Sequence, residues 1–513
     1  MPVNSQSALY QKNIRRWNVV RDCVDGQESI QIGGVKYLPK PAGQSKEDYQ
    51  NYQARAVFFD GTSRTAEGLH GHIFAKDPVQ AGEDKLTEAA KEILKDIDGA
   101  CSGIDEYISG TTWDSIQTGF GGHLVDHTPV EPGTSVAEKK GRAYLKWYSA
   151  ESIYLHKYSA INGVKKLSKV ILREDVEEED PKDEFNTVMT EAYRVLSFDK
   201  EGKYIQRVYK KSSDDKKSGF VQDGLTIKPE INGVRLDFIP FFTSPGEDPE
   251  KSMLLGLAYE NIGHYQKTAE YENGLFYTSV PTLVVENMET PTIEEEYKTK
   301  DAEGKVITKK RKIKVTITMG GSTAKFFCQY NKDGTFADVR VKYVEFTGAG
   351  IGEILKALNA CLDRMAKLGI QAIGSEKKGV ETAEVAQLHR AAENGVLGAF
   401  ARSSSNRATE AVRLMLKWNL PKENVDAWSY QLNTDFDYKG LSAQILTIMY
   451  NARQSNEIPR SVWFDTLKKH GIVPEEMTYE QFVEKIQIDN TGGHGPYGDG
   501  DEKNDDNLTL LNQ

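Results

Sequence analysis

The 513-residue sequence contains few cysteines and no long hydrophobic run. Cys23, Cys101, Cys328 and Cys361 lie far apart and form no CxxC pair, so they fit isolated reduced thiols better than a disulfide framework or a zinc site. No run approaches the ~18 consecutive apolar residues of a membrane helix, and the N-terminal residues lack the apolar core of a signal peptide. We therefore expect a protein of the cytosol that has no membrane partner.

The motifs of the common catalytic sites are also missing. No GxxxxGK[ST] loop is present, and Gly61, Gly68 and Gly71, which lie in FFDGTSRTAEGLHGHIFAK, do not have that spacing. No GxSxG motif marks a nucleophilic serine, and no cysteine–histidine signature marks a nucleophilic thiol. We therefore expect a protein that is not an enzyme and that holds no cofactor.

Histidine pairs are the remaining candidates for a metal site. His123 and His127 are four residues apart, and His70 and His72 are two apart. Two histidines at i and i+4 on a helix can share a zinc ion, but FGGHLVDHTP begins with two glycines and ends in proline, which disfavours a helix. A metal site is the less favoured alternative at both pairs.

The stretch around the first pair is better explained as a helix. Its start resembles an N-terminal cap at Thr62 or Ser63, and Pro78 lies where the helix must stop. The residues at helical spacing along its apolar face are Thr65, Leu69 and Ile73.

Length and charge limit the class of protein. The length favours roughly three structural units. The net charge of −11 argues against a nucleic-acid coat that wraps phosphate tightly, but not against a smooth acidic surface past which DNA slides. The composition is 38% apolar and 27% charged, as in soluble proteins.

The first half of the chain mixes helical and β patterns, which predicts an α+β fold. Helical periodicity covers 83–97 and, less cleanly, 102–119. Short β-rich runs follow from Ala143 to Phe242, and DKEGK supplies a hairpin turn between two of them. The acidic run VEEEDPKDE, residues 176–184, is interpreted as a solvated loop between strands.

The second half begins and ends with helices around a β-rich block. We expect helices over 252–279 and 351–369, with the β-rich block 280–346 between them. Within that block, 292–314 is a charged hairpin that turns at DAEGK and carries eight basic and five acidic residues.

A glycine-bearing loop, 371–380, then leads into a long helical stretch. That stretch runs from Glu381 to Trp418, and Gly395 and Gly398 favour a kink in it. Shorter helices follow, and the polar tail 490–513 is predicted to be disordered.

The order of several segments resembles the portal proteins of tailed bacteriophages. Each segment is weakly specific alone, but their ordered set covers most of Tyr49 to Trp418. The segments are YQNYQARAVFFDGTSRTAEGLHGHIFAKDP, TGFGGHLVDHTP, YSAESIYLHK, FIPFFTSP, LLGLAYENIGHYQKTAEYENGLFYTSVPTLVV, GAGIGEILKALNACLDRMAKLGIQAI and ETAEVAQ.

The resemblance implies a portal-like fold: an α/β wing, a two-helix stem, a β-rich clip and a helical crown. The wing region would be 1–250, the stem helices 251–280 and 349–370, and the clip 281–348. The tunnel loop and long kinked wing helix would be 371–435, the crown-like helices 436–489 and the tail 490–513. The charged hairpin has no clear counterpart in a common clip.

The resemblance also implies partners. Portals are rings, commonly of twelve subunits, at one capsid vertex. They contact the major capsid protein and in some systems a scaffold. They also dock the large terminase subunit and later a head–tail adaptor or tail protein, and they pass double-stranded DNA without reading its sequence. The protein would therefore be found in the virion, and in the host cytoplasm during assembly. Alternatives are another head or adaptor component and a packaging ATPase.

Three sets of residues are the candidate sites in such a ring. Because the chain is acidic, the stem walls are expected to be acidic and to let phosphate slide. Lysines of the tunnel loop would touch the DNA, a basic strand of the hairpin would dock partners, and apolar residues of the second stem helix would pack subunits together. These sets are Lys377 and Lys378; Lys309, Lys310, Arg311, Lys312 and Lys314; and Ile354, Leu358 and Met365.

Overall fold

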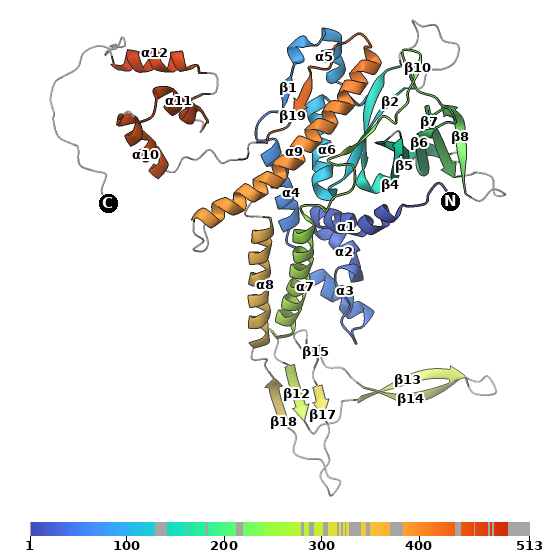
Figure 1. Ribbon diagram of the computed structural model, residues 1–513. Coiled ribbons are helices and arrows are strands. Elements are labelled where there is room, and N and C mark those ends of the chain that lie inside the picture. Colours follow the sequence, from blue (N-terminus) through green and yellow to red (C-terminus); the bar gives the residue numbers. More distant parts are fainter. Residues whose placement is uncertain are drawn as a thin grey trace, which may run out of the picture. The chain divides into compact units, whose positions relative to one another are not determined.

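The structure is a computed structural model with an α+β fold (Figure 1). It divides into two compact units, Met1–Asp435 and Phe436–Gln513, where the length had suggested about three. The described residues are 2–128, 141–161, 163–180, 183–211, 219–278, 282–286, 292–300, 306–314, 318–319, 322–323, 325–327, 340–344, 349–369, 383–434, 436, 443–455, 457–469, 472–474 and 477–490.

Helices make up the N-terminal part of the first unit. Helix α1 (Ala8–Asp25) begins where Ser7 accepts a hydrogen bond from the Tyr10 backbone N–H, and it packs against α4 and α6. The other elements here are α2 (Gln27–Ile32), η1 (Gly34–Lys36), α3 (Lys46–Arg55), α4 (Gly61–Ile73), η2 (Glu83–Lys85), α5 (Glu88–Leu94) and α6 (Ile104–Thr118).

Helix α4 confirms the helix predicted around the first histidine pair, but its ends differ. The capping position is Asp60, which makes no side-chain cap hydrogen bond, so the caps predicted at Thr62 and Ser63 are wrong. Both residues lie inside the helix, and Thr62 is fully buried. The helix predicted over 83–97 is shorter as well, because Thr87 caps a new helix at the Ala90 N–H.

Within residues 121–244 the chain forms two sheets of three or more strands. The first has the order β11–β2–β3, and its middle strand carries the second histidine pair, as the disfavoured helix at FGGHLVDHTP had indicated. A Cβ at Gly121 would lie 2.1 Å from the Trp147 ring, and one at Gly122 would lie 2.3 Å from the Phe241 ring, so both aromatic side chains need glycine there. The strands are β2 (Gly121–His127), β3 (Ala143–Ser149) and β11 (Phe241–Ser244).

The second sheet is an antiparallel meander in the order β4–β5–β6–β7–β8. The turn predicted at DKEGK joins β6 and β7 and is confirmed. The strands are β4 (Ile153–Ile161, after η3, Ala150–Ser152), β5 (Val164–Asp180), β6 (Asp183–Phe198), β7 (Tyr204–Lys211) and β8 (Phe220–Ile227); β9 (Glu230–Ile231) and β10 (Val234–Arg235) form a separate small hairpin.

The acidic run 176–184 is not the solvated loop that was predicted. Strand β5 continues through Asp180, and Glu177, Glu178 and Glu179 pair with Met189, Val188 and Thr187 of β6. Charged residues are tolerated here because exposed side chains on a projecting ribbon keep their water while the backbone hydrogen bonds continue. Charge alone therefore did not indicate where the strand ends.

Two long helices follow the sheets and lie side by side (Figure 1). They are α7 (Leu255–Thr278) and α8 (Ala349–Leu368), close to the predicted 252–279 and 351–369. The chain between them is β-rich, as predicted. Its strands are β12 (Thr282–Glu286), β13 (Thr292–Lys300), β14 (Val306–Lys314), β15 (Thr318–Met319), β16 (Ser322–Thr323), β17 (Lys325–Phe327) and β18 (Arg340–Val344).

Helix α9 (Ala383–Asn419) returns the chain to the first sheet, where it packs against β2, β3 and β11. It runs without a break through Gly395 and Gly398, so neither glycine ends the helix. At its C-terminal end, the Asn419 side chain exchanges two hydrogen bonds with the backbone of Ala143, at 2.8 and 2.9 Å. Strands β1 (Val79–Ala81) and β19 (Ser429–Gln431) then pair beside it.

The second unit contains α10 (Ala443–Gln454), α11 (Arg460–Lys469) and α12 (Tyr479–Asn490). Phe464, Leu467 and Val473 form its small buried core. These helices confirm the helical pattern predicted for 436–489, while the tail predicted to be disordered lies outside the described residues. No helix in the part of the chain that the structure describes is long and apolar enough to cross a membrane.

Candidate functional site

The α7–α8 pair is the candidate site, together with the strands between the two helices. The helices run antiparallel, since a Cβ at Gly274 would lie 3.7 Å from Ile351 Cγ1 and one at Gly256 would lie 3.9 Å from Leu368 Cδ2. The start of α7 therefore meets the end of α8. A Cβ at either glycine would be in ordinary van der Waals contact with α8, so alanine fits at both positions without moving the helix.

The apolar face of α8 is buried within the chain. Leu358, Cys361 and Met365 are 7%, 0% and 0% exposed. Part of this burial comes from α4, because a Cβ at Gly61 would lie 2.6 Å from Met365 Cε. The structure thus assigns Leu358 and Met365 to packing inside the chain, which corrects the interpretation of them as residues held for a neighbouring subunit. Ile354 is half-buried, and its packing between subunits stays a prediction.

The outer surface of the helix pair has mixed charge. Helix α7 carries three acidic residues and one lysine, and α8 carries two acidic and three basic residues, so the pair has a net charge of −1. Arg364 Nε donates to Glu260 Oε2 at 3.0 Å across the two helices, and Lys356 pairs with Glu353 along α8. The helix pair is therefore acidic, as expected of the stem walls, but by one charge only, and most of the negative charge lies elsewhere in the chain.

The charged insertion is a β-hairpin with the predicted bounds. Strands β13 and β14 pair from Thr292 opposite Lys314 to Lys300 opposite Val306. The predicted turn at DAEGK lies outside the described residues. Most described side chains of this ribbon are polar and exposed, and its apolar ones, Tyr297 and Val306, are 39% and 58% exposed. None of the described side chains of the ribbon is buried, so they join no core.

The basic strand of the hairpin is partly neutralised by its acidic partner. Arg311 lies 2.6 Å from Glu295, and Lys310 lies 3.4 Å from Glu296 and 3.8 Å from Glu294. Lys309 instead faces Tyr297 in the register. Exposed pairs of this kind contribute at most about 1 kcal/mol each, so they leave the lysines available to a stronger anionic partner.

Of the remaining predicted site residues, only some are among the residues that the structure describes. Lys377 and Lys378, with the rest of the predicted tunnel loop, lie outside the described residues. Lys312 is exposed on β14, and the Lys314 backbone ends that strand.

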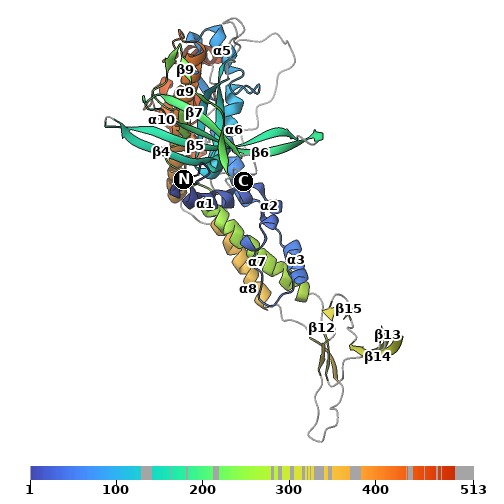
Figure 2. The same cartoon turned by 90° about the vertical axis from the view of Figure 1, so that its right-hand side faces the viewer.

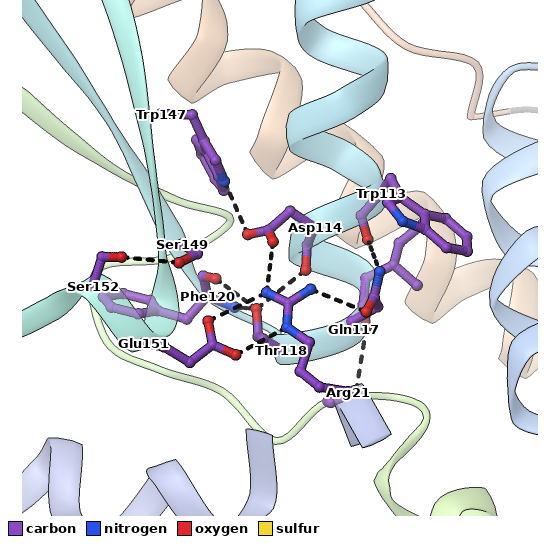
Figure 3. A network of polar contacts seen from close by, with 12 residues as sticks. Arg21, Trp113, Asp114, Gln117, Thr118, Phe120, Trp147, Ser149, Glu151 and Ser152 are labelled. Carbon is purple, nitrogen blue, oxygen red and sulfur yellow. Dashed lines mark hydrogen bonds and ion pairs between the residues drawn. The ribbon is translucent and has the colours of Figure 1, made fainter. Parts of the chain in front are cut away.

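A polar network around Arg21 connects α1 to the body of the unit (Figure 3). The Arg21 guanidinium donates to Glu151 at 2.9 Å and to Gln117 at 3.0 Å, and it forms an ion pair with Asp114. Trp147 Nε1 donates to the other oxygen of Asp114 at 2.9 Å. Burial raises the pKa of Asp114, while Arg21 acts in the opposite direction. The Arg21 side chain thereby connects α1 to α6 and η3. Its partners satisfy the guanidinium, which is consistent with a structural role.

A second network lies between the two sheets. Arg194 donates to Glu174, Asp126 and Gln206 at 3.0, 3.0 and 2.9 Å. Burial alone would raise the pKa of Glu174, but Arg194 and Lys146, with a hydrogen bond from the Tyr148 hydroxyl, lower it to about 2. The Glu174 carboxylate therefore stays charged and forms an ion pair with the Arg194 guanidinium. Neither network was predicted from the sequence, because a lone arginine does not indicate partners that lie far along the chain.

The side chains of His70, His123 and His127 contact different partners. His123 is buried, 3.2 Å from the Tyr107 hydroxyl and edge-on to the Trp147 ring, whereas His70 lies 3.1 Å from the Ser109 carbonyl oxygen. His127 Nδ1 lies 2.8 Å from the Thr128 carbonyl oxygen. Among the residues that the structure describes, no group of three or more histidine, cysteine or acidic side chains could hold a metal ion.

Residues 253–419 match one protein family, which is described as a domain of unknown function (DUF4055). The match begins just before α7 and ends with the last residue of α9, so it covers the helix pair, the strands between the helices and the helix that packs on the sheet. No curated protein matches the chain.

Proposed function

We propose that this chain is a portal protein of a tailed bacteriophage. It forms a ring at one vertex of the capsid, and double-stranded DNA passes through the ring during packaging and ejection. The observation that carries the proposal is the order of elements over one continuous segment: α7, a β-rich excursion, α8 antiparallel to α7, and then α9 on the sheet. That order agrees with the stem, clip, stem and wing helix that the resemblance implies.

The surface of the helix pair supports a passive conduit. Its acidic and basic residues nearly balance, and pairs such as Arg364 with Glu260 neutralise one another. A phosphate backbone therefore meets neither a strongly repulsive nor a strongly attractive wall. Exposed contacts of this kind are weak and screened by salt, so the polymer has no deep minimum at which to stop.

Two further parts of the proposal concern the basic segments. Lys377 and Lys378 would form a ring of ammonium groups that steadies the DNA without reading its bases, since phosphate contacts carry no sequence information directly. The β13–β14 hairpin would dock the terminase motor during packaging and the head–tail connector afterwards. A ribbon charged on both faces suits a docking element, because electrostatic contacts form quickly and can be exchanged.

Sizing the purified chain tests the proposal. A ring of twelve 57.4 kDa subunits has a mass of about 0.69 MDa, which light scattering measures directly. We expect that mass, or a neighbouring ring number, together with no ATP hydrolysis. A chain that hydrolyses ATP would instead support a packaging ATPase, and a chain that stays monomeric would support another head or adaptor component.

A further inference from the structure

The five-stranded sheet carries opposite charges at its two ends. Strand β5 contains KKLSK near its start and EEED at its end. The β4–β5 end, with Lys157, Lys165, Lys166 and Lys169, is called here the basic arm. The β5–β6 end, which includes Glu177, Glu178 and Glu179, is called the acidic arm.

The two arms cannot neutralise each other within one chain. They are hairpins at opposite ends of β5, and Figure 2 shows them projecting in opposite directions. Lys166 and Glu178 are twelve residues apart on one strand, which is roughly 40 Å at about 3.3 Å per residue. That distance is several times the screening length of about 8 Å at physiological salt.

The basic arm retains charge that its own chain does not match. Lys165 pairs with Glu247 at 2.6 Å. Lys157 and Lys169, however, are directly opposite each other in the β4–β5 register, and like charges at such a position destabilise a sheet. In the part of the chain that the structure describes, no ion pair joins Lys157, Lys166 or Lys169 to an acidic residue.

The acidic arm shows the complementary pattern. Glu178 pairs with Lys210 at 2.6 Å, while Glu177 accepts a hydrogen bond from the Thr187 hydroxyl but, within the described residues, has no cation partner. The facing strand exposes apolar side chains: Val188 is 44% and Met189 is 63% exposed. Apolar groups beside unmatched charge are typical of a surface that binds a protein rather than small ions.

We propose that the acidic arm of one copy of this chain binds the basic arm of a second copy, head to tail. This inference rests on the proposed ring, in which copies lie side by side, and it names an inter-subunit contact. A copy of the same chain supplies the complement of both arms, whereas a nucleic acid would match only the basic one. A contact between two different surfaces repeats from copy to copy and closes when the rotation between copies permits it.

Charge reversal at residues without an intramolecular ion pair tests the contact. Lys166→Glu with Lys169→Glu removes the net positive charge of the basic arm, because two of its four lysines become glutamates. Glu177→Lys with Glu179→Lys removes the net negative charge of EEED in the same way. Each double variant should need an at least about tenfold higher protein concentration for half-assembly, measured by light scattering at low salt. In the quadruple variant, the reversed positions again carry opposite charges on the two arms, so it should assemble like the parent. An equimolar mixture of the two double variants should do so too, since each reversed position then meets an opposite charge on the other variant.

The control is Lys46→Glu with Lys422→Glu, which reverses two exposed lysines outside the five-stranded sheet and should leave assembly unchanged. Double variants that assemble like the parent would overturn the arm contact and leave the ring in place. Failure of both the quadruple variant and the mixture to recover, while the control assembles, would also overturn it. A parent chain that stays monomeric at every concentration overturns the ring and the arm contact together.

Discussion

At the scale of single residues, one of the histidines singled out in the sequence, His123, lies in the core of the structure. Burial lowers the pKa of His123 to about 3, so the folded protein keeps this ring neutral where the unfolded chain protonates it. The histidine was a metal candidate only because its spacing was visible. Its actual neighbours, Tyr107 and Trp147, come from other elements and could not be read from that spacing.

The burial of His123 predicts that acid destabilises the fold. A histidine whose folded pKa is depressed contributes stability above its unfolded pKa of about 6.5, and that stability is lost as the pH falls towards 3. Between pH 7 and pH 5 the loss should be about 2 kcal/mol in the free energy of unfolding. His123→Leu should lack this part of the pH dependence, as denaturant unfolding at the two pH values would measure.

Tyr107→Phe is the matched control for this prediction. It removes the hydroxyl beside His123 but keeps the ring that buries it. The drop between pH 7 and pH 5 should therefore persist in this variant. If His123→Leu keeps the full drop as well, burial of this histidine is not its cause.

The two arginine networks show a limit of reasoning from sequence at this scale. Arg21 binds Asp114 and Glu151, which are 93 and 130 residues further along the chain. Nothing local distinguishes Arg21 from the neighbouring arginines of α1, because the fold alone decides which of them meets a carboxylate.

At the scale of elements, the periodicity of the sequence predicted the bounds of helices and strands well where each element pairs with one neighbour. The bounds of the β13–β14 hairpin were predicted from its alternation and its central DAEGK, and α7 and α8 were predicted within a few residues. The acidic run was mispredicted because a projecting ribbon can be both charged and extended. The composition of this run indicates that its side chains are solvated, but it does not indicate the conformation of the backbone.

Leu358→Asp should destabilise the helix pair itself. The side chain is 7% exposed against its own chain, so a carboxylate there loses its water without a partner. The expected cost is about 3 kcal/mol or more in unfolding free energy, with a lower melting temperature. Leu355→Asp on the same helix is the control, since Leu355 is 44% exposed, and it should change stability little. Equal effects at both positions would contradict the assigned burial.

Deleting the hairpin tests its role separately from the fold. Because residues 292–314 pair with each other from end to end, their removal should leave ring formation and the melting temperature unchanged while it abolishes terminase binding. Terminase binding to the parent should also weaken as salt rises. Normal DNA packaging by the deletion variant would sink the docking hypothesis and leave a solvated hairpin.

At the scale of the whole molecule, the order of elements carries the functional argument. The α+β class followed from composition and pattern, whereas the antiparallel contact of α7 with α8 and the return of α9 to the sheet needed coordinates. The charge of the α7–α8 pair could not be inferred from the net charge of the chain, because the acidic residues are concentrated elsewhere, as on the acidic arm.

Electron cryomicroscopy of the purified chain tests the central claim most directly. The account predicts closed rings of about twelve subunits with an open central channel, in which α7 and α8 of every subunit surround an axis wide enough for a DNA duplex. Particles without a central channel would contradict the account, as would rings in which the α7–α8 pair lies away from the axis.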